Sequence, residues 1–390
     1  DEAGMVDSKS MQELVTLTHK SGGKIVLIGD TKQLQAISSG GSMNAIIQHT
    51  NIPVAYLNES RRQKTELARS VVNQTVNKQA SSALLQLHNA GKLHLTNTKI
   101  EAIEKTVEKW AQNYSHINIS SSVMIANTNA DIKTLNTTAR DNLKQKGSLD
   151  KDNDYQVPVQ NREGTSLGDK AFTNGDRIIF KKNERSFGIL NGELATITNI
   201  TCDKSSYEIS AVKADGATVS FNTSSYSRFD HGYAITTHAS QGSTVDNVVV
   251  LSGGHMQDFH STYVQVSRAR LDIELVTTKT GIDAQMNSLQ PTENMIIYAK
   301  DLSASLGITN DSNPIENRSF AEVRDFLNEH SPKAINSGDK PLQFNEIKEL
   351  ASAMSKEKIK ETSLDYTEVE KADLKNTDIK NKEAEHEVDL

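Results

Sequence analysis

The chain has 390 residues, enough for two or three domains with cores of their own. Hydrophobic residues make up 36% of the chain, and no apolar run approaches the length of a membrane span, so a membrane-embedded protein is excluded. The single cysteine, Cys202, excludes a disulfide framework and a cysteine-based zinc site, and it favours a reducing, cytoplasmic compartment. The net charge is -7, so any contact with nucleic acid would rest on local basic and hydroxyl groups.

Two short acidic segments lie near the start of the chain. Asp1 and Glu2 come first, a helix is predicted over 9–19, and an apolar strand predicted over 24–30 ends in Gly29-Asp30, with Gln33 shortly after. Sequential parallel strands place their ends side by side, and paired acidic groups there suit Mg²⁺ binding and activation of water. The alternative is that Asp1 and Glu2 form an exposed turn or a helix start.

The chain lacks the phosphate-binding loop that such a site needs. The pattern GxxxxGK[ST] occurs nowhere in these residues. Because Asp1 is not a methionine and the first residues resemble the end of a motif, we expect a fragment without its N-terminal part. A predicted strand over 54–57 is followed by Arg61 and Arg62, which open a helix over 65–76 and could reach a phosphate. A basic helix start on the surface is the alternative.

Residues 81–145 show alternating helical and strand patterns. Helices are predicted over 81–87, 100–110 and 130–145, and strands over 92–95 and 122–126. Thr128 and Asn129 follow the second strand, where they could hold backbone phosphates of a nucleic acid. Their other predicted role is to cap the helix that follows, and the two roles are compatible.

A different pattern occupies the middle of the chain. Residues 150–173 are polar, and we predict a loop with little fixed structure. Turn signals then separate short strands predicted over 176–180, 193–200, 206–212 and 218–221. These strands predict a small antiparallel barrel of about 55 to 65 residues that is inserted into an α/β lobe.

The stretch from Tyr233 to Thr244 resumes the parallel pattern. An apolar run leads into a turn of small residues, and a buried strand is predicted over 245–251. Ligands of open α/β sheets bind at such strand ends. A short helix over 259–266 and a strand over 271–278 follow, with Arg268 between them. Arg268 could stabilise transferring phosphate charge, or it could be an ordinary surface arginine.

The order of these motifs resembles motifs II to VI of superfamily 1 helicases of the RecD-like branch. The matching stretches are Asp1-Glu2-Ala3-Gly4, Gly29-Asp30 with Gln33-Leu34, Glu59-Ser60-Arg61-Arg62-Gln63, Asn191-Gly192-Glu193, Thr237-His238-Ala239-Ser240-Gln241-Gly242-Ser243 and Tyr263-Val264-Gln265-Val266-Ser267-Arg268-Ala269. The opening motif and residues 29–37 are most similar to the helicase part of conjugative relaxases of the TraI and TraA type. The resemblance covers roughly residues 1 to 280.

This resemblance implies an α/β fold with two RecA-like lobes, parallel sheets and an SH3-like insert. The implied domains are an incomplete first lobe (1–60), a second lobe in two parts (61–165 and 232–280), the SH3-like barrel insert (166–231) and a poorly defined helical region with a charged tail (281–390). Helices are predicted over 317–329 and 344–360 in that last region. The residues from 355 onward are typical of a solvated or disordered tail.

The resemblance also implies roles for individual residues. Asp1 would bind Mg²⁺, Glu2 would activate water, and Gln33 would sense the γ-phosphate of ATP. Arg62 and Arg268 would reach across the cleft. Asp30, Gln241 and Gly242 would lie near the nucleotide. The residues implied to contact the DNA strand are Thr128, Asn129, Thr237, His238 and Ser240. His238 could instead be a packed histidine at a helix start.

The function implied is that of an ATP-dependent helicase that moves 5′ to 3′ on single-stranded DNA, from a conjugative transfer protein. Type IV secretion or coupling proteins would be further partners. The relaxase chemistry of the family requires a tyrosine and a three-histidine metal site, and nothing here matches them. Without the phosphate loop, we expect these residues alone to bind ATP poorly and not to unwind DNA. The alternatives are a RecD-like repair helicase and a non-catalytic remnant that binds DNA or a partner.

Overall fold

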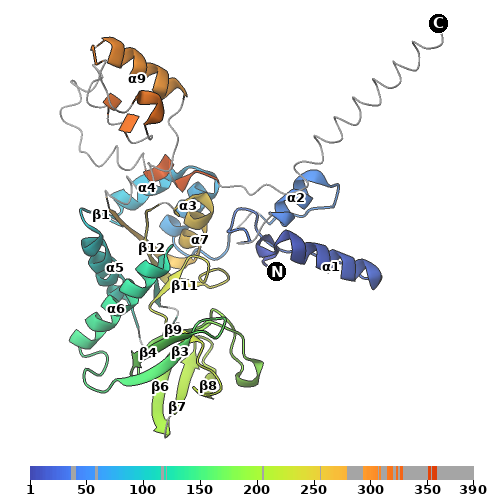
Figure 1. The fold of residues 1–390 in the computed structure, drawn as a ribbon, viewed down its shortest axis with the longest axis vertical. Helices are drawn as coiled ribbons and strands as arrows, with labels where there is room; N and C mark the ends of the chain where they lie inside the picture. Colours follow the sequence, from blue (N-terminus) through green and yellow to red (C-terminus); the bar gives the residue numbers. More distant parts are fainter. Residues whose placement is uncertain are drawn as a thin grey trace. The chain divides into compact units, whose positions relative to one another are not determined.

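A computed structural model describes most of the chain up to residue 278 and short stretches beyond it. The described residues are 1–36, 41–57, 60–115, 118–119, 121–203, 206–254, 256–278, 293–305, 307–308, 314–318, 322–323, 326–327, 350–352 and 354–357. They fall into two compact units, one formed by the described residues of 1–59 with Glu357 and the other by those of 60–356 (Figure 1). No helix in the described part is both long and apolar enough to cross a membrane.

The first unit contains short helices and extended segments. Its elements are η1 (Ala3–Met5), α1 (Ser8–Lys20) and α2 (Ser42–His49). The predicted helix over 9–19 is confirmed, and Asp7 caps it by accepting a hydrogen bond of 2.9 Å from the Ser10 N–H. The strands predicted over 24–30 and 54–57 are wrong, because neither segment pairs with another strand among the described residues of this unit. Their apolar side chains consequently remain accessible, as with Val26 at 82% exposure.

The second unit is built on a parallel sheet of five strands. These are β1 (Leu93–Thr96), β2 (Ser122–Ala126), β10 (Ala234–Thr236), β11 (Val245–Leu251) and β12 (Ala269–Thr278), in the order β1-β12-β11-β2-β10. All neighbouring strands run parallel. The predicted α/β class with a parallel sheet is therefore confirmed.

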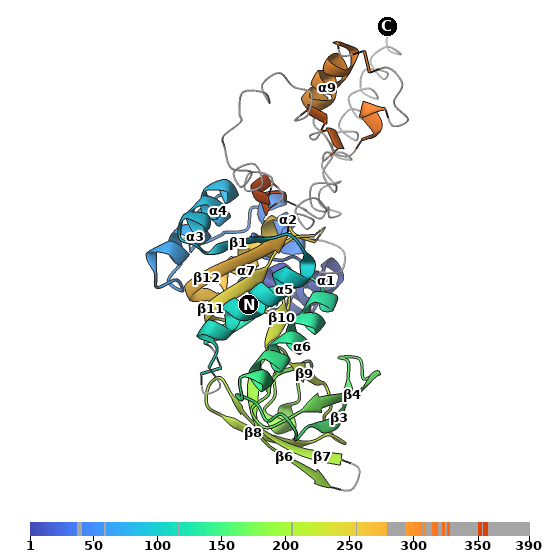
Figure 2. The same ribbon diagram turned by 90° about the vertical axis from the view of Figure 1, so that its left-hand side faces the viewer.

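Helices cover both faces of this sheet, as Figure 2 shows for α5 and α6 in front of the strands. The helices are α3 (Glu66–Val76), α4 (Ala80–Asn89), α5 (Lys99–Asn113), α6 (Asn129–Gln145) and α7 (Phe259–Ser267). Val123 of β2 packs in the core with α3, α4 and α7, whereas the next residue, Met124, packs with α5 and α6. Successive side chains of a strand point to opposite faces, so a strand buried on both faces is continuously apolar.

An antiparallel region connects α6 to β10. It comprises β3 (Tyr155–Gln160), β4 (Ser166–Phe172), β5 (Arg177–Phe180), η2 (Arg185–Phe187), β6 (Leu194–Asp203), β7 (Ser206–Lys213), β8 (Thr218–Asn222) and β9 (Phe229–His231). Five of these strands form a sheet in the order β8-β7-β6-β5-β9, and β3 pairs with β4. The predicted antiparallel strands are confirmed, whereas an SH3-like barrel and the domain boundaries stay predictions.

The loop predicted over 150–173 is wrong, because β3 and β4 form a hairpin there. Val157 and Val159 of β3 are buried, whereas Gln156 before them and Pro158 between them are exposed. This alternation of period two is the signature of a half-buried strand. The polar residues that suggested a loop form the exposed face of the hairpin.

Buried polar contacts join the antiparallel region to the parallel sheet. The carboxylate of Asp176, before β5, accepts hydrogen bonds from Arg140 Nε of α6 at 3.1 Å and from the Tyr233 hydroxyl at 2.6 Å. Burial and the charge of Asp176 raise the pKa of Tyr233 well above its usual value, which keeps this hydroxyl a donor. The neighbouring Arg177 is fully buried, and its guanidinium lies 4.5 Å from the ring centre of Tyr114.

Beyond the sheet, the structure describes α9 (Glu293–Ser305) and η3 (Ile315–Asn317). These elements share a small apolar core that includes Ala299 and Ile315. The helices predicted over 317–329 and 344–360 lie largely outside the described residues, as does the charged tail.

Candidate functional site

In the first unit, the backbone brings the two acidic segments together. The Ala3 N–H donates to the Ile28 carbonyl at 2.9 Å, which sets Asp1 and Glu2 beside Gly29 and Asp30. A Cβ added to Gly29 would lie 3.0 Å from the Ala3 nitrogen and 3.1 Å from the Gly4 nitrogen, so this close approach requires glycine. The predicted juxtaposition of the acidic ends therefore forms without the strand ladder that was expected to create it.

Asp1, Glu2, Gly29 and Asp30 form an acidic edge, and two of these residues have distinctive local geometry. Glu2 has φ 56°, a left-handed conformation that costs energy for a residue with a side chain and that is frequent at functional sites. Asp30 accepts hydrogen bonds from the Lys32 N–H at 2.9 Å and from Gln33 Nε2 at 3.4 Å. The predicted residues Asp30 and Gln33 are thus in direct contact.

The acidic edge fits a magnesium ion held chiefly through a nucleotide. Asp1 is exposed, and one of its oxygens accepts the Glu2 N–H at 2.9 Å. The described residues contain no cluster of three or more His, Cys, Asp or Glu that could hold a metal by themselves. Mg²⁺ in nucleotide enzymes usually has one or two carboxylates, several waters and the substrate phosphates as ligands. This edge can supply the carboxylates, while no GxxxxGK[ST] loop is present among the 390 residues to hold the phosphates.

In the second unit, the loop that links β10 to β11 runs from the C-terminal ends of the parallel strands to their N-terminal ends. These two ends form opposite edges of the sheet. At the start of the loop Thr236 is level with Ala126, the last residue of β2, whereas at its end Asn247 is level with Ser122, the first residue of β2. The loop carries the predicted residues Thr237, His238, Ser240, Gln241 and Gly242. The predicted residues of this unit are therefore divided between two opposite edges.

The edge where β11 and β12 begin holds the two predicted arginines. Arg268, at the C-terminus of α7, is only 1% exposed, so the surface alternative is wrong. Its Nε donates to the Val264 carbonyl at 3.0 Å and its Nη1 to the Ser243 carbonyl at 3.4 Å, which places it directly below the turn of Gln241 and Gly242. Gly242 has φ 77° in this turn, a conformation that favours glycine.

Arg62 reaches the same edge from a segment that precedes α3. Its Nη1 donates to the Ser267 carbonyl at 2.8 Å, and it is half-buried. The adjacent Gln63 is 4% exposed and its Nε2 donates to the carbonyls of Ser267 and Ala269 at 3.2 and 3.0 Å. The predicted Arg62 and Arg268 are therefore brought together around the carbonyl-rich end of α7.

The opposite edge holds a closed network of buried polar side chains. Gln265 Nε2 donates to Thr237 Oγ1 and to Asn127 Oδ1, each at 2.9 Å. Thr237 Oγ1 donates to Asn127 Oδ1 at 2.6 Å, and Asn127 Nδ2 donates to Gln257 Oε1 at 2.9 Å. Gln257 Nε2 completes the ring by donating to Gln265 Oε1 at 2.9 Å. The network joins the ends of β2 and β10 to α7, the helix that ends at Arg268.

The remaining predicted residues surround this network. Thr128 caps α6, since its Oγ1 accepts from the Asp131 N–H at 3.1 Å, so the capping role is confirmed; Asn129 is exposed next to it. His238 is half-buried in the turn after β10. Ser240 is fully buried and donates to the Thr237 carbonyl at 2.8 Å. The hydroxyls of Thr237 and Ser240 are therefore engaged in hydrogen bonds within the loop and its network, and their contact with a DNA strand stays a prediction.

Sequence reasoning missed Gln63, Asn127, Gln257 and Gln265. A polar signal existed for two of them: Asn127 directly follows a buried strand, and Gln265 interrupts the apolar positions of a short helix. No local pattern marks Gln257, because its partners are distant in the sequence.

Comparisons with known proteins show what the chain is similar to. A family model described as an AAA domain matches residues 1–98. The conjugal transfer protein TraA of Agrobacterium fabrum is 33% identical over 278 residues, which are 70% of this chain and 24% of that protein. The multifunctional conjugation protein TraI of Escherichia coli is 22% identical over 74% of this chain and 22% of its own length. The chain is therefore related to the TraA and TraI conjugation proteins.

Solved structures support the fold assignment. The Bacteroides Pif1 helicase in complex with ADP-AlF3 and ssDNA matches with a TM-score of 0.51 and 16% identity, over 78% of this chain and 74% of that one. The same helicase bound to ssDNA matches with a TM-score of 0.50 over 78% of this chain and 75% of that one, again at 16% identity. At this identity the likeness concerns the fold alone. The chain spans about a quarter of the length of the TraA proteins that it matches.

Proposed function

We propose that this chain is the motor region of an ATP-dependent helicase that moves along single-stranded DNA in a conjugative relaxase-helicase. The observation that carries this proposal is the loop between β10 and β11. It joins the polar network around Thr237 to the turn that rests on Arg268. A motor needs such a connection, because a change at the nucleotide must be transmitted to the strand that is moved.

Roles for individual residues follow from this proposal. Glu2 orients or deprotonates the attacking water, Asp1 holds Mg²⁺, and Asp30 and Gln33 position the terminal phosphate. ATP with Mg²⁺ supplies the phosphoryl group and the charge that must be neutralised during its transfer. Arg62 and Arg268, which share the end of α7, provide positive charge that offsets the negative charge of the phosphoryl group during its transfer.

Arg268 has to leave its present contacts to act in this way. Its guanidinium is buried against the carbonyls of Val264 and Ser243. Movement of the turn that contains Ser243 would release it. We therefore assign to this turn the conformational step that accompanies hydrolysis.

On the DNA side, Thr128, Asn129 and His238 contact the strand, and Thr237 and Ser240 hold the loop that carries His238. Contacts of this kind favour the sugar-phosphate backbone, so binding is tolerant of sequence and sensitive to salt. Movement from 5′ to 3′ follows from the family resemblance. Action in the cytoplasm together with type IV secretion or coupling proteins is part of the same proposal and rests on the similarity to conjugal transfer proteins.

The substitution Glu2→Gln tests the catalytic part of the proposal. In the protein encoded by the gene that contains these residues, it should abolish ATP turnover and leave the affinity for single-stranded DNA unchanged. Glu13→Gln, which alters an exposed carboxylate of α1, is the matched control and should leave both quantities unchanged. Turnover that persists in Glu2→Gln would show that Glu2 is not the base.

A non-catalytic DNA-binding role is the second candidate, and the absence of GxxxxGK[ST] from these 390 residues favours it. The two candidates differ in a single measurement. If the encoded protein binds a labelled oligonucleotide but shows no DNA-stimulated ATP hydrolysis, the motor function is refuted and the binding function stands.

A further inference from the structure

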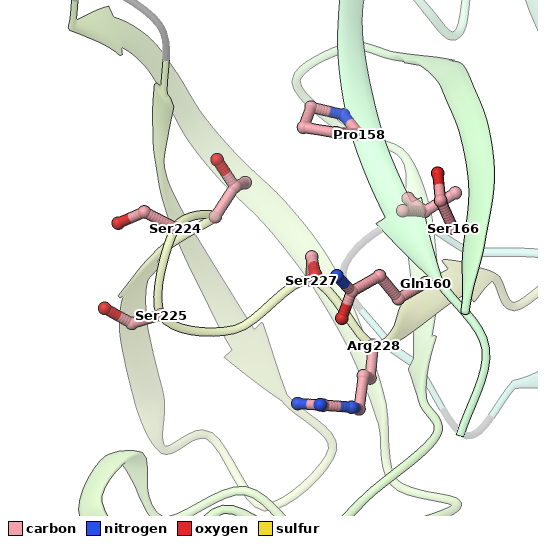
Figure 3. Close-up of a pocket in the computed structure, with 9 residues that line it drawn as sticks. Pro158, Gln160, Ser166, Ser224, Ser225, Ser227 and Arg228 are labelled. Carbon is pink, nitrogen blue, oxygen red and sulfur yellow. The ribbon is translucent and has the colours of Figure 1, made fainter. Parts of the chain in front are cut away.

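The antiparallel region contains a polar pocket that is lined by none of the residues assigned to the proposed motor. The pocket has a volume of about 460 Å³ and lies between the β3–β4 hairpin and the segment that links β8 to β9 (Figure 3). Its lining includes Gln160, Ser166, Thr223, Ser225, Ser227 and Arg228. Pockets of roughly 300–1,000 Å³ accommodate small ligands, so this one has room for a nucleotide-sized group.

Arg228 is the only charged residue of this lining, and it lacks a partner. Within the described part of the chain, its guanidinium makes no hydrogen bond and no ion pair, and its Nε is buried without an acceptor. A buried donor without a partner costs roughly 1–3 kcal/mol, and more when it is charged. An acceptor from outside the chain would remove this cost.

Glu184, a carboxylate that interacts electrostatically with Arg228, already has hydrogen-bond partners. The carboxylate of Glu184 accepts hydrogen bonds from the Ser186 hydroxyl at 2.7 Å and from the Ser186 N–H at 3.3 Å. These bonds are the main cause of its lowered pKa, and the charges of Lys182 and Arg228 contribute less. Arg228 therefore interacts electrostatically with this carboxylate but forms no hydrogen bond to it.

The position of Arg228 is fixed by its neighbours. A Cβ added to Gly164 in the hairpin turn would lie 3.1 Å from Arg228 Nη2, so the guanidinium packs against the backbone of that turn. The Gln160 N–H donates to the Ser227 carbonyl at 2.9 Å, which ties the hairpin to the segment that carries the arginine. In Figure 3 the side chain extends toward the side where Ser224 and Ser225 lie. A guanidinium held in place loses less entropy when it binds an anion.

We propose that this pocket binds a phosphate group of the single-stranded DNA, with Arg228 as its charged donor and the surrounding hydroxyls as further donors. Arginine forms paired hydrogen bonds with phosphate oxygens, and serine and threonine hydroxyls commonly add to such contacts. An isolated carboxylate ligand would suit the arginine equally, but the abundance of hydroxyls and the room for a whole nucleotide favour a phosphodiester. This proposal rests on the proposed function only for the source of the phosphate.

The first experiment tests the DNA strand as the source. Affinity of the 390-residue chain for a fluorescein-labelled oligothymidylate is measured over a series of salt concentrations. One phosphate contact contributes about 0.7 to the slope of log affinity against log salt for a single strand. Arg228→Gln should reduce the slope by that amount, whereas Arg185→Gln, which removes an exposed arginine of the same region, should not. An equal effect of both substitutions, or no effect of either, contradicts a DNA contact in the pocket.

A second variant distinguishes a binding defect from a folding defect. A second probe tests the phosphate site independently of the motor hypothesis. Ser225 is exposed, so Ser225→Asp adds a repelling charge at the pocket without disturbing the core. Inorganic phosphate, compared with chloride at equal ionic strength, should raise the thermal midpoint of the wild-type chain but not of Arg228→Gln or Ser225→Asp. If phosphate stabilises the wild type and the oligonucleotide does not bind, the phosphate site stands while the DNA function fails. If neither probe distinguishes the variants from wild type, the proposal is overturned.

Discussion

Gln265 Nε2 lies 2.9 Å from Thr237 Oγ1 and joins the helix α7 to the first residue of the loop that crosses the sheet. Gln265 is fully buried, so this contact is shielded from water. Three residues further along the chain, Arg268 supports the other end of the same loop through the Ser243 carbonyl. The helix thus holds both ends of the loop, and a displacement of α7 would move the two edges of the site together.

We predict that Gln265→Leu uncouples the two edges. The substitution removes one hydrogen-bond partner from each of Thr237, Asn127 and Gln257, at a cost of about 1–3 kcal/mol in unfolding free energy. In the encoded protein, basal ATP turnover should persist while its stimulation by DNA falls. Urea unfolding and ATPase assays with and without oligonucleotide measure the two effects.

Gln145→Leu, at an exposed position at the end of α6, is the control for Gln265→Leu. It should change neither quantity. A loss of stability in Gln265→Leu with full DNA stimulation would show that the network only supports the fold.

The Thr128 hydroxyl caps α6, and it also belongs to the proposed DNA site. Thr128→Ala should destabilise the chain by about 1 kcal/mol, because the N-terminus of α6 loses its cap, and it should also weaken oligonucleotide binding. Thr128→Ser retains the hydroxyl and should restore both. Equal oligonucleotide affinity in the alanine and serine variants would restrict Thr128 to capping.

The second unit could be predicted from the sequence to a large extent. The strand over 122–126 and the strand over 245–251 were predicted with the bounds that β2 and β11 have. Both are continuous apolar runs, because helices cover the two faces of the sheet. The hairpin of β3 and β4 was missed because its exposed face is polar, and only the alternation of Val157 and Val159 marks it.

The first unit shows why a local pattern can fail. Residues 24–29 have the composition of a buried strand, yet a strand forms only where another strand supplies the ladder, and the described residues of this unit contain none. Prediction of the candidate site from the sequence is limited in a similar way. Motif order indicated Arg62 and Arg268, but Gln63 and Gln257 act through partners far away in the sequence, such as Ala269 and Asn127. Such pairings emerge only from the fold.

We expect Asp176 to be essential for the packing of the antiparallel region against the parallel sheet. Its buried carboxylate bonds Arg140, Tyr233 and the Thr173 N–H, the last at 2.7 Å. Asp176→Asn removes the charge and should destabilise the chain by about 3–5 kcal/mol, because Arg140 loses one of its two carboxylate partners in a buried place. Asp141→Asn, at an exposed position of α6, should stay within about 0.5 kcal/mol of the wild type in urea unfolding. A small effect of Asp176→Asn would show that Asp154, the other partner of Arg140, suffices for this junction.

Glu274 of β12 should give the chain an acid-sensitive stability. Burial opposes its ionisation, but hydrogen bonds from His94 at 2.7 Å and Lys92 at 3.1 Å, with the charges of Lys92 and Lys109, lower its pKa from 4.5 to about 2. A carboxyl group whose pKa is lower in the folded state stabilises the fold fully above its unfolded pKa, and this contribution disappears as pH falls through the folded pKa. Stability should therefore decrease from about pH 4.5 down to about pH 2. Glu274→Gln should be less stable at neutral pH and show a shallower decrease in this range, measured by urea unfolding at stepped pH. Parallel pH profiles for the variant and the wild type would assign the acid sensitivity to other carboxyl groups.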